Sequence, residues 1–212
     1  MSGSGIAIQK PRKRGSRKLS TKILISGDGP SEKAYFDRFV GVNPAVKVIS
    51  LSSGKSGFKR ILEKTDGYVK ENGVDVRRGD RVAIVTDVDD VHDAEDVGWM
   101  VRECERRGYE LYLSNPCFEV WLLLHFIFSA KGGSAKEFEE RVDHQMRTRF
   151  DRPYVKSSGI PRDPSLLESA MVNASRLQGD GDGTAEWCRG KNPSTTVHRL
   201  VTVIDSRSGP EA

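Results

Sequence analysis

Two groups of acidic side chains have the residue types and the spacing for metal chemistry. Each group directly follows a short apolar segment, KILIS (22–26) in the first case and RVAIVT (81–86) in the second. The acidic residues are Asp28 and Glu32 after the first segment, and Asp87, Asp89 and Asp90 after the second.

These carboxylates could bind Mg²⁺ or Mn²⁺. In an extended chain Asp87 and Asp89 point to the same side, so both can face one hard cation. A cation held there neutralises phosphate charge and lowers the pKa of a bound water, which favours phosphodiester hydrolysis. The alternative is that the aspartates only form turns and helix caps. Because two groups close two apolar segments, the sequence favours a metal site.

Apolar periodicity predicts the elements that must position these residues. Four segments have the composition of buried strands, and helical spacing of apolar residues follows each of the first three. The strands are expected at 22–26, 46–51, 81–86 and 109–113. This alternation predicts an α/β fold with a mainly parallel four-stranded sheet flanked by helices. Ligands bind at the carboxyl ends of such strands, so both acidic groups should lie at one edge of the sheet.

The length and the patterning predict one main domain with two appendages. A chain of 212 residues can bury a sizeable core. We expect a flexible basic arm over 1–20, the α/β core over 21–115, and a helical part packed on it over 116–212. Within the last part, helices are expected at 118–128, 138–146, 166–177 and 197–204, with a loop near 179–183.

Basic residues are concentrated at the start of the chain. Lys and Arg together number 34 against 30 for Asp and Glu, and the basic residues are unevenly placed, because the arm holds 6 of them and no acidic residue. Such arms bind phosphate backbones through counterion release, and a solubilising tail is the alternative. The candidate nucleic-acid contacts are Lys10, Arg12, Lys13, Arg14, Arg17 and Lys18 in the arm, and Lys55, Lys59 and Arg60 after the second strand.

Several other classes of protein are disfavoured. The 3 cysteines are far apart and form no zinc or disulfide pattern. A leader segment and a membrane-spanning run are both absent, so we expect a cytoplasmic protein that does not contact a membrane. Gly54-Lys55-Ser56 resembles part of a P-loop, but Ile49 stands where the motif requires its first glycine. The 4 histidines are scattered, and no nucleophile triad is recognisable.

Four blocks of the sequence resemble known families. ILISGDGPSEKAYF (23–36) and VTDVDD (85–90) resemble the two acidic motifs of Toprim nucleases. SNPCFEVWLLLHF (114–126) and NPSTTVHRLV (192–201) resemble the signature blocks of the RloB-like family. The resemblance implies a Toprim-like, Rossmann-like core. It also implies a nuclease group that is encoded near restriction systems, is linked to abortive infection and has an AAA-type ATPase as its usual partner.

The resemblance also implies roles for individual residues. Asp87 and Asp89 take the metal-binding positions, with Asp90 beside them. Asp28 stands where Toprim proteins carry a glutamate that acts in general acid/base chemistry, and its shorter side chain would reach the reacting oxygen through a water or a shifted loop. Glu32 matches the second glutamate and is the reserve candidate for the acid/base or metal role.

Further signature positions have no role that follows from the residues. Asn115 follows the fourth strand and could reach the same edge, and His198 could do so if the last helix packs there. His125 lies in an apolar segment, where a core histidine is the alternative. Asn192 and Ser194 are alternatively caps of the last helix. The full set is Asn115, Glu119, His125, Asn192, Ser194, Thr195 and His198.

Two functions are therefore open. The first is a metal-dependent endonuclease acting on DNA or RNA as the effector of a bacterial anti-phage system. The second is a catalytically weak or inactive nucleic-acid-binding subunit regulated by an ATPase partner. Asp28, the departure from the Toprim pattern, keeps the second function open.

Overall fold

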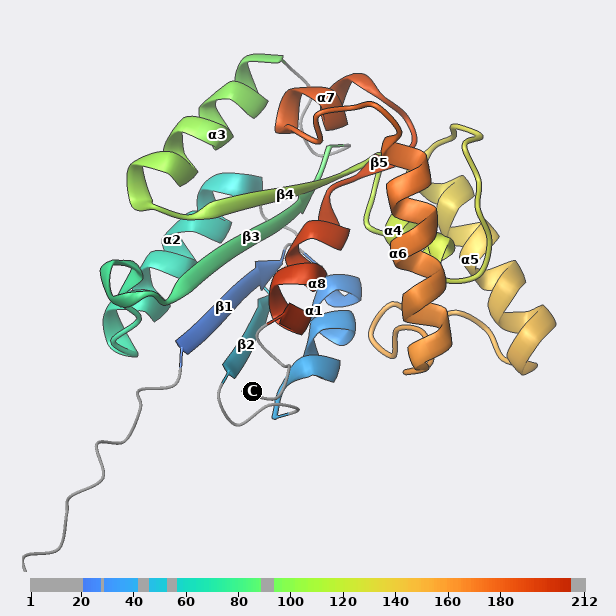
Figure 1. Ribbon diagram of the computed structural model, residues 1–212, viewed down its shortest axis with the longest axis horizontal. Coiled ribbons are helices and arrows are strands. Elements are labelled where there is room, and N and C mark those ends of the chain that lie inside the picture. The colour runs from blue at the N-terminus through green and yellow to red at the C-terminus, as the bar shows by residue number, and fades with distance from the viewer. Residues whose placement is uncertain (1–20, 28, 42–45, 53–56, 89–93, 207–212) are drawn as a thin grey trace, which may run out of the picture.

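The fold is built on one five-stranded sheet. The computed structural model describes residues 21–27, 29–41, 46–52, 57–88 and 94–206. The strand order is β2-β1-β3-β4-β5, and the first four strands are parallel (Figure 1). The short last strand runs antiparallel to β4. The strands are β1 (Thr21–Gly27), β2 (Val46–Ser52), β3 (Arg81–Asp87), β4 (Glu110–Asn115) and β5 (Ser194–Thr195).

Helices cover both faces of this sheet. In Figure 1, α2 and α3 lie on one face, α1 and α8 lie on the other, and α4, α5 and α6 gather beyond the β4 and β5 end. The helices are α1 (Pro30–Phe36), α2 (Gly57–Glu71), α3 (Ala94–Arg107), α4 (Glu119–Leu124), α5 (Ala135–Phe150), α6 (Pro164–Gln178), α7 (Ala185–Gly190) and α8 (Val197–Ser206), with 3-10 turns η1 (Asp37–Phe39) and η2 (Val76–Arg78).

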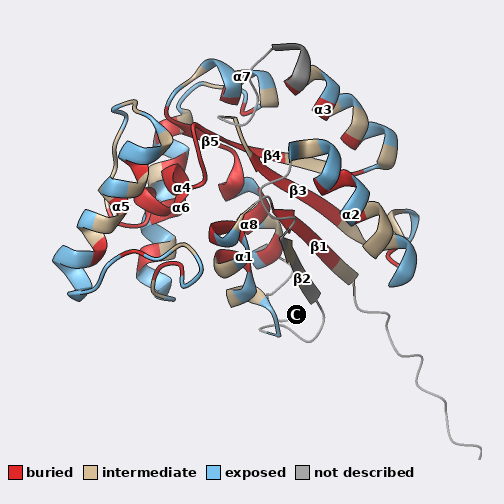
Figure 2. Cartoon of the chain, turned by 180° about the vertical axis from the view of Figure 1, so that it is seen from behind, coloured by how far each residue is buried: buried red, intermediate tan, exposed pale blue. Residues whose placement is uncertain are grey.

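The strand pleat divides the core between the two faces. Ile23, Ile25 and Val85 belong to the cluster that includes α1, α4, α5, α6 and α8. Their neighbours Leu24 and Ile84 point the other way and pack with α2 and the end of α3. Because successive side chains of a strand alternate between faces, apolar runs such as KILIS fill both layers. Figure 2 shows the central strands and α4 buried, whereas the outer sides of α2, α3 and α5 are exposed.

Local sequence explains where several helices begin. Pro30 occupies the first turn of α1, where the missing N–H costs no hydrogen bond. Ser134 and Glu137 form a capping box at the start of α5. Asp163 caps α6 by accepting a hydrogen bond from the backbone N–H of Ser165.

The structure confirms the predicted α/β class and the four parallel strands, but it corrects three details. The sheet is mixed, because the two polar residues of β5 pair antiparallel with the end of β4. The helix expected at 118–128 is α4 and ends at Leu124, since the next N–H groups bond three residues back in a tighter turn. The helical spacing of apolar residues after the first strand extends to Val40, but the helical structure ends in η1 and Val40 is 50% exposed. Hydrophobicity predicted burial in α4 correctly but could not set its length.

Within the described part of the chain, helices that are both long and apolar enough to cross a membrane are absent.

Candidate active site at the carboxyl edge of the sheet

The strand register brings the predicted acidic region to one edge. Gly27 at the end of β1 pairs with Val85 of β3, and Asp87 at the end of β3 pairs with Ser114 of β4. The residues that follow β1, β3 and β4 therefore start from neighbouring positions. Of the predicted acidic residues, Glu32 and Asp87 are described, and Asp28, Asp89 and Asp90 lie outside the described residues.

Glu32 folds back over the end of β1. It lies in the first turn of α1 and is only 3% exposed. A methyl group built on Gly27 would lie 2.7 Å from Cβ of Glu32, and one built on Gly29 would lie 3.0 Å from its Oε2. The two glycines of the GDG segment therefore leave the space that the Glu32 side chain fills.

A second buried carboxylate lies beside this turn. Glu119, in the first turn of α4, is 3% exposed. Its Oε1 accepts hydrogen bonds from the Ser31 hydroxyl at 2.9 Å and from the Tyr154 hydroxyl at 3.0 Å. The Lys156 ammonium lies 3.7 Å from the same oxygen and 3.0 Å from Oε2 of Glu139. The buried charge of Glu119 is thus compensated by two hydroxyls and one cation.

The charges of Glu32, Glu119 and Asp87 affect two buried side chains between these elements, Tyr154 and Cys117. Burial, followed by the charge of Glu119 and a smaller effect of Glu32, raises the pKa of Tyr154 far above its ordinary value. Burial also raises the pKa of the Cys117 thiol, and the charges of Glu119 and Asp87 add to this. Glu119 therefore acts on both side chains, whereas Glu32 acts on Tyr154 and Asp87 acts on Cys117.

The signature residues at the ends of β4 and β5 tie that edge together. Asn115 donates from Nδ2 to the carbonyls of Cys188 at 3.0 Å and Arg189 at 2.9 Å, which holds α7 against β4. The Ser194 hydroxyl donates to the carbonyl of Cys188 at 2.8 Å. The hydroxyls of Thr195 and Ser114 lie 2.9 Å apart. These hydrogen bonds of Asn115, Ser194 and Thr195 join β4, β5 and α7, so their described role is structural.

The alternative of helix capping by Asn192 or Ser194 is wrong. Asn192 instead exchanges two hydrogen bonds with the backbone of Gly133, at 3.2 and 2.9 Å. The backbone N–H of Val197, the first residue of α8, donates to the Thr195 hydroxyl at 3.2 Å. β5 ends one residue before α8, so the Thr195 hydroxyl can accept from this first helical N–H.

The two signature histidines are both buried and neutral. His125 contacts the Tyr35 hydroxyl through Nε2 at 3.2 Å and the Trp121 carbonyl through Nδ1 at 3.0 Å. Burial, followed by the charge of Arg38, lowers the pKa of His125 to about 3. Burial and then Arg199 lower the pKa of His198 to about 4. The packing of His125 matches a core histidine, whereas His198 lies in the first turn of α8, next to β5.

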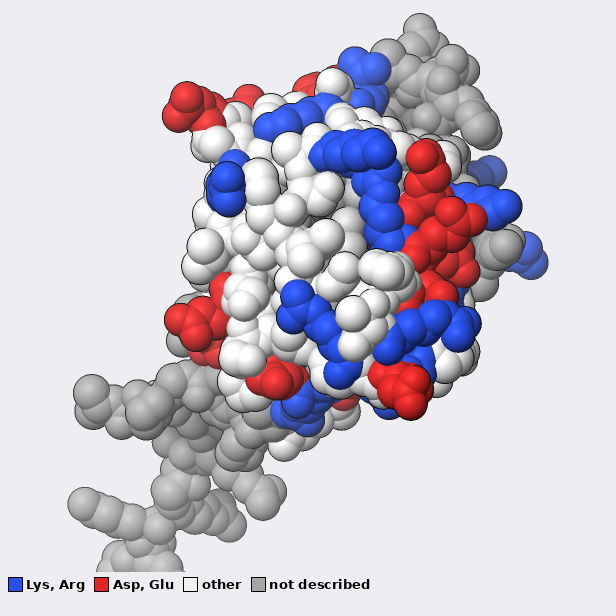
Figure 3. Space-filling view, turned by 90° about the vertical axis from the view of Figure 1, so that its right-hand side faces the viewer, with Lys and Arg blue, Asp and Glu red and all other residues white. Residues whose placement is uncertain are grey.

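The predicted nucleic-acid contacts are only partly described. Lys59 and Arg60 are exposed on the first turns of α2. The arm residues and Lys55 lie outside the described residues. On the face shown in Figure 3, basic and acidic side chains of the described residues lie beside one another.

The carboxylate ligands available at this edge suit a hard cation, but the described residues do not complete a metal site. Carboxylate oxygens such as those of Glu32 and Asp87 are the ligands that Mg²⁺ prefers. Among the described residues, groups of three or more His, Cys, Asp or Glu able to hold a metal ion are absent. One or two carboxylates, waters and a substrate phosphate are a usual magnesium environment. The residue types at this edge therefore fit the expected ion.

Sequence reasoning missed three residues of this site. Tyr154 and Lys156 lie between α5 and α6, far from every acidic motif, and no spacing pattern marks them. Ser31 was signalled only as part of the GDGPSE segment. Their contacts with Glu119 arise from tertiary packing.

Comparison with known proteins gives a match at the level of the family. A family model described as RloB-like protein matches residues 23–204. Neither a curated protein nor a solved structure matches the chain.

Proposed function

This chain belongs to the RloB-like family, and on that premise we propose that it hydrolyses phosphodiester bonds of nucleic acid with the help of a bound divalent metal ion. The observation that carries the proposal is that Glu32, Asp87 and Glu119 lie at or just after the carboxyl ends of β1, β3 and β4, which are neighbours in a largely parallel sheet. This edge is where α/β folds bind ligands.

The acidic residues divide into two roles in this proposal. Asp87, with Asp89 and Asp90, would hold Mg²⁺ or Mn²⁺, and Asp28 or Glu32 would move the proton or complete the metal site. A bound metal ion there would neutralise phosphate charge and lower the pKa of an attacking water. Glu119 has neither of these two roles, because hydroxyl donors already occupy its Oε1.

The wider setting follows from the resemblance of the acidic segments to Toprim nucleases and from the family. We propose a Toprim-like nuclease that acts in the cytoplasm of a bacterium as the effector of an anti-phage, abortive-infection system. An AAA-type ATPase would be its partner, and the basic arm with Lys55, Lys59 and Arg60 would hold the nucleic-acid backbone.

A cleavage assay on the full-length protein tests this function. Single-stranded DNA, duplex DNA, RNA and tRNA would each be incubated with Mg²⁺, Mn²⁺ or excess chelator, alone and with an AAA-type ATPase if the genomic neighbourhood of the gene encodes one. We expect cleavage of at least one substrate that needs a divalent metal. Asp87→Asn should abolish it, because this change removes a carboxylate at a strand end, and should leave the melting temperature within about 2–4 °C of the wild type.

Asp180→Asn is the matched control, since Asp180 is an exposed carboxylate after α6 and distant in sequence from the acidic motifs. Cleavage by Asp87→Asn in chelator would contradict the proposed site. Binding of nucleic acid without cleavage of any substrate, even with the ATPase, would favour the non-catalytic binding subunit.

A further inference from the structure

The geometry points to Glu119 as a positioning residue that acts through Ser31 and Tyr154 to fix the first turn of α1, and with it Glu32. This inference rests on the proposed function, since it assigns the support of the same site. It gives a role to a signature position that the sequence left without one, and it adds Tyr154, which no motif marked.

One oxygen of the Glu119 carboxylate is already occupied by hydrogen-bond donors. Oε1 accepts from the Ser31 hydroxyl at 2.9 Å and from the Tyr154 hydroxyl at 3.0 Å, and the two hydroxyl oxygens are themselves 3.0 Å apart. Burial and the charges of Glu119 and Glu139 act on Lys156 in opposite directions, and the charges prevail, so its pKa is raised. A carboxylate with these partners is suited to hold neighbouring groups rather than to bind a metal ion through Oε1.

Ser31 is linked directly to Glu32. The two residues are consecutive in the first turn of α1 and both are 3% exposed. Glu32 is confined on its other side by Gly27 and Gly29, at which an added methyl group would be 2.7 and 3.0 Å from it. A side chain confined in this way follows any shift of its own helical turn, because close-packed interiors leave no space for compensation.

Tyr154 is itself anchored by hydrogen bonds of its segment. Its backbone N–H donates to Oδ1 of Asp143 in α5 at 2.8 Å. Further along the same segment, the carbonyls of Ile160 and Pro161 accept from Arg38 at 3.3 and 3.2 Å. The segment between α5 and α6 is thus tied to α5 and to the region just after α1. The backbone that carries Tyr154 is therefore held in place where its hydroxyl contacts Glu119.

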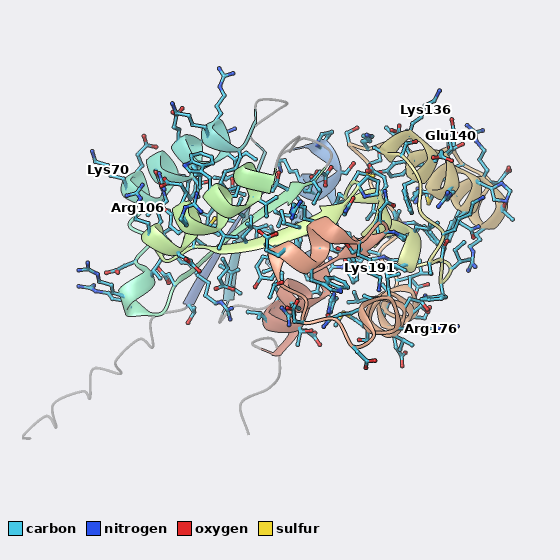
Figure 4. All side chains as sticks on the ribbon, turned by 90° about the horizontal axis from the view of Figure 1, so that it is seen from above. Lys70, Arg106, Lys136, Glu140, Arg176 and Lys191 are labelled. Carbon is cyan, nitrogen blue, oxygen red and sulfur yellow. The ribbon has the colours of Figure 1, made fainter. Side chains whose placement is uncertain are left out.

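Lys136 is a suitable comparison for Lys156. Figure 4 shows Lys136 and Glu140 on the outer side of α5, where their 3.9 Å ion pair is exposed. Lys136 is 86% exposed and Lys156 is 43% exposed, and of these two pairs only that of Lys156 includes a buried carboxylate. Lys136→Met is therefore a matched control for Lys156→Met.

The central test compares two tyrosines in the full-length protein. Tyr154 and Tyr109 are both 9% exposed, and each donates its hydroxyl to a carboxylate, Glu119 in one case and Asp66 in the other. Tyr154→Phe and Tyr109→Phe each remove one hydroxyl without opening a cavity. The probe is Mn²⁺ alone, titrated by electron paramagnetic resonance without substrate, and hydrogen exchange of the α1 amides is measured on the same samples.

We expect Tyr154→Phe to weaken Mn²⁺ binding by about 10–100-fold, the usual cost of losing a residue that orients metal ligands. The α1 amides should exchange faster in the same variant. Tyr109→Phe should leave both unchanged. Ser31→Ala should behave like Tyr154→Phe, and Ser31→Thr, which keeps the hydroxyl, should restore most of the affinity.

The inference is overturned if Tyr154→Phe leaves both Mn²⁺ affinity and α1 exchange at wild-type values, or if Tyr109→Phe changes them equally. If the wild type binds no Mn²⁺, the metal-dependent function fails. In that case the positioning role is decided by α1 exchange alone. Faster exchange in Tyr154→Phe and in Lys156→Met, but not in Tyr109→Phe and Lys136→Met, then supports it, and equal exchange rejects it.

Discussion

The carboxylate of Glu119 accepts a hydrogen bond from the Ser31 hydroxyl at 2.9 Å, although the two residues are 88 positions apart in sequence. This bond joins the acidic segment after β1 to the signature segment after β4. Two sequence blocks that looked independent therefore belong to one site. The consequences for activity and stability can be measured at several points around that bond.

The first prediction concerns Asp28, which departs from the Toprim pattern. If a water bridges its shorter carboxylate to the reacting oxygen, Asp28→Glu should retain or raise activity. Asp28→Ala should lower it by about 10²–10⁴-fold, the usual contribution of a general acid or base. Glu32→Gln should be the milder change. Single-turnover cleavage rates check this, and a silent Asp28→Ala with an inactive Glu32→Gln would move the catalytic role to Glu32.

The second prediction concerns the basic arm. Deleting residues 1–17 removes Lys10, Arg12, Lys13, Arg14 and Arg17. Nucleic-acid affinity should fall for all sequences, and the slope of log K against log salt on a duplex should become shallower by about 0.9 for each phosphate that is no longer neutralised. The melting temperature should not change. Binding isotherms at several salt concentrations measure the slope, and identical slopes would identify the arm as a solubilising tail.

The third prediction concerns the space that Glu32 fills. Gly27→Ala would place a methyl group 2.7 Å from Cβ of Glu32, so Glu32 must move. We expect a stability loss of about 1–3 kcal/mol from overpacking and a loss of cleavage of about 10²-fold from misplacement.

Gly67→Ala in α2 is its matched control. A methyl group there meets no atom within 4 Å, and alanine should stabilise the helix by about 0.5–1 kcal/mol. Urea unfolding and cleavage rates are measured on both variants. Wild-type cleavage by Gly27→Ala would show that the position of Glu32 does not matter.

The fourth prediction concerns acid stability. The folded-state pKa values of His125 and His198, about 3 and about 4, lie below the ordinary 6.5. The unfolded chain therefore takes up protons at a pH where the folded protein does not. The stability from these groups is fully present above pH 6.5 and falls as the pH decreases toward 4, by about 1.4 kcal/mol per histidine per pH unit well below 6.5.

Urea unfolding at pH 7.5, 6.5 and 5.5 measures this slope. His125→Phe removes one titrating group, so the difference in unfolding free energy between pH 7.5 and 5.5 should shrink even if the variant is less stable at both. His144→Gln, at an exposed histidine of α5, should behave like the wild type. An unchanged slope in His125→Phe would refute the assignment of a neutral buried histidine.

The sequence by itself determined the α/β class, the four parallel strands and the family. Strand ends such as Gly27 and Asp87 were predictable to within one or two residues, because side-chain alternation and apolar runs are local properties of the chain. The acidic groups could then be assigned to one edge, because parallel strands share their carboxyl ends.

Only the tertiary structure decided how that edge is supported. The hydrogen bonds of Glu119 with Ser31 and Tyr154, and the pairing of Ser194 and Thr195 with the end of β4, join residues that are far apart in sequence. Such contacts leave no periodic pattern of residue types in the sequence, because they form only when helices and strands pack. The same packing makes His125 a buried, neutral partner of Tyr35, although its sequence position alone left a catalytic role open.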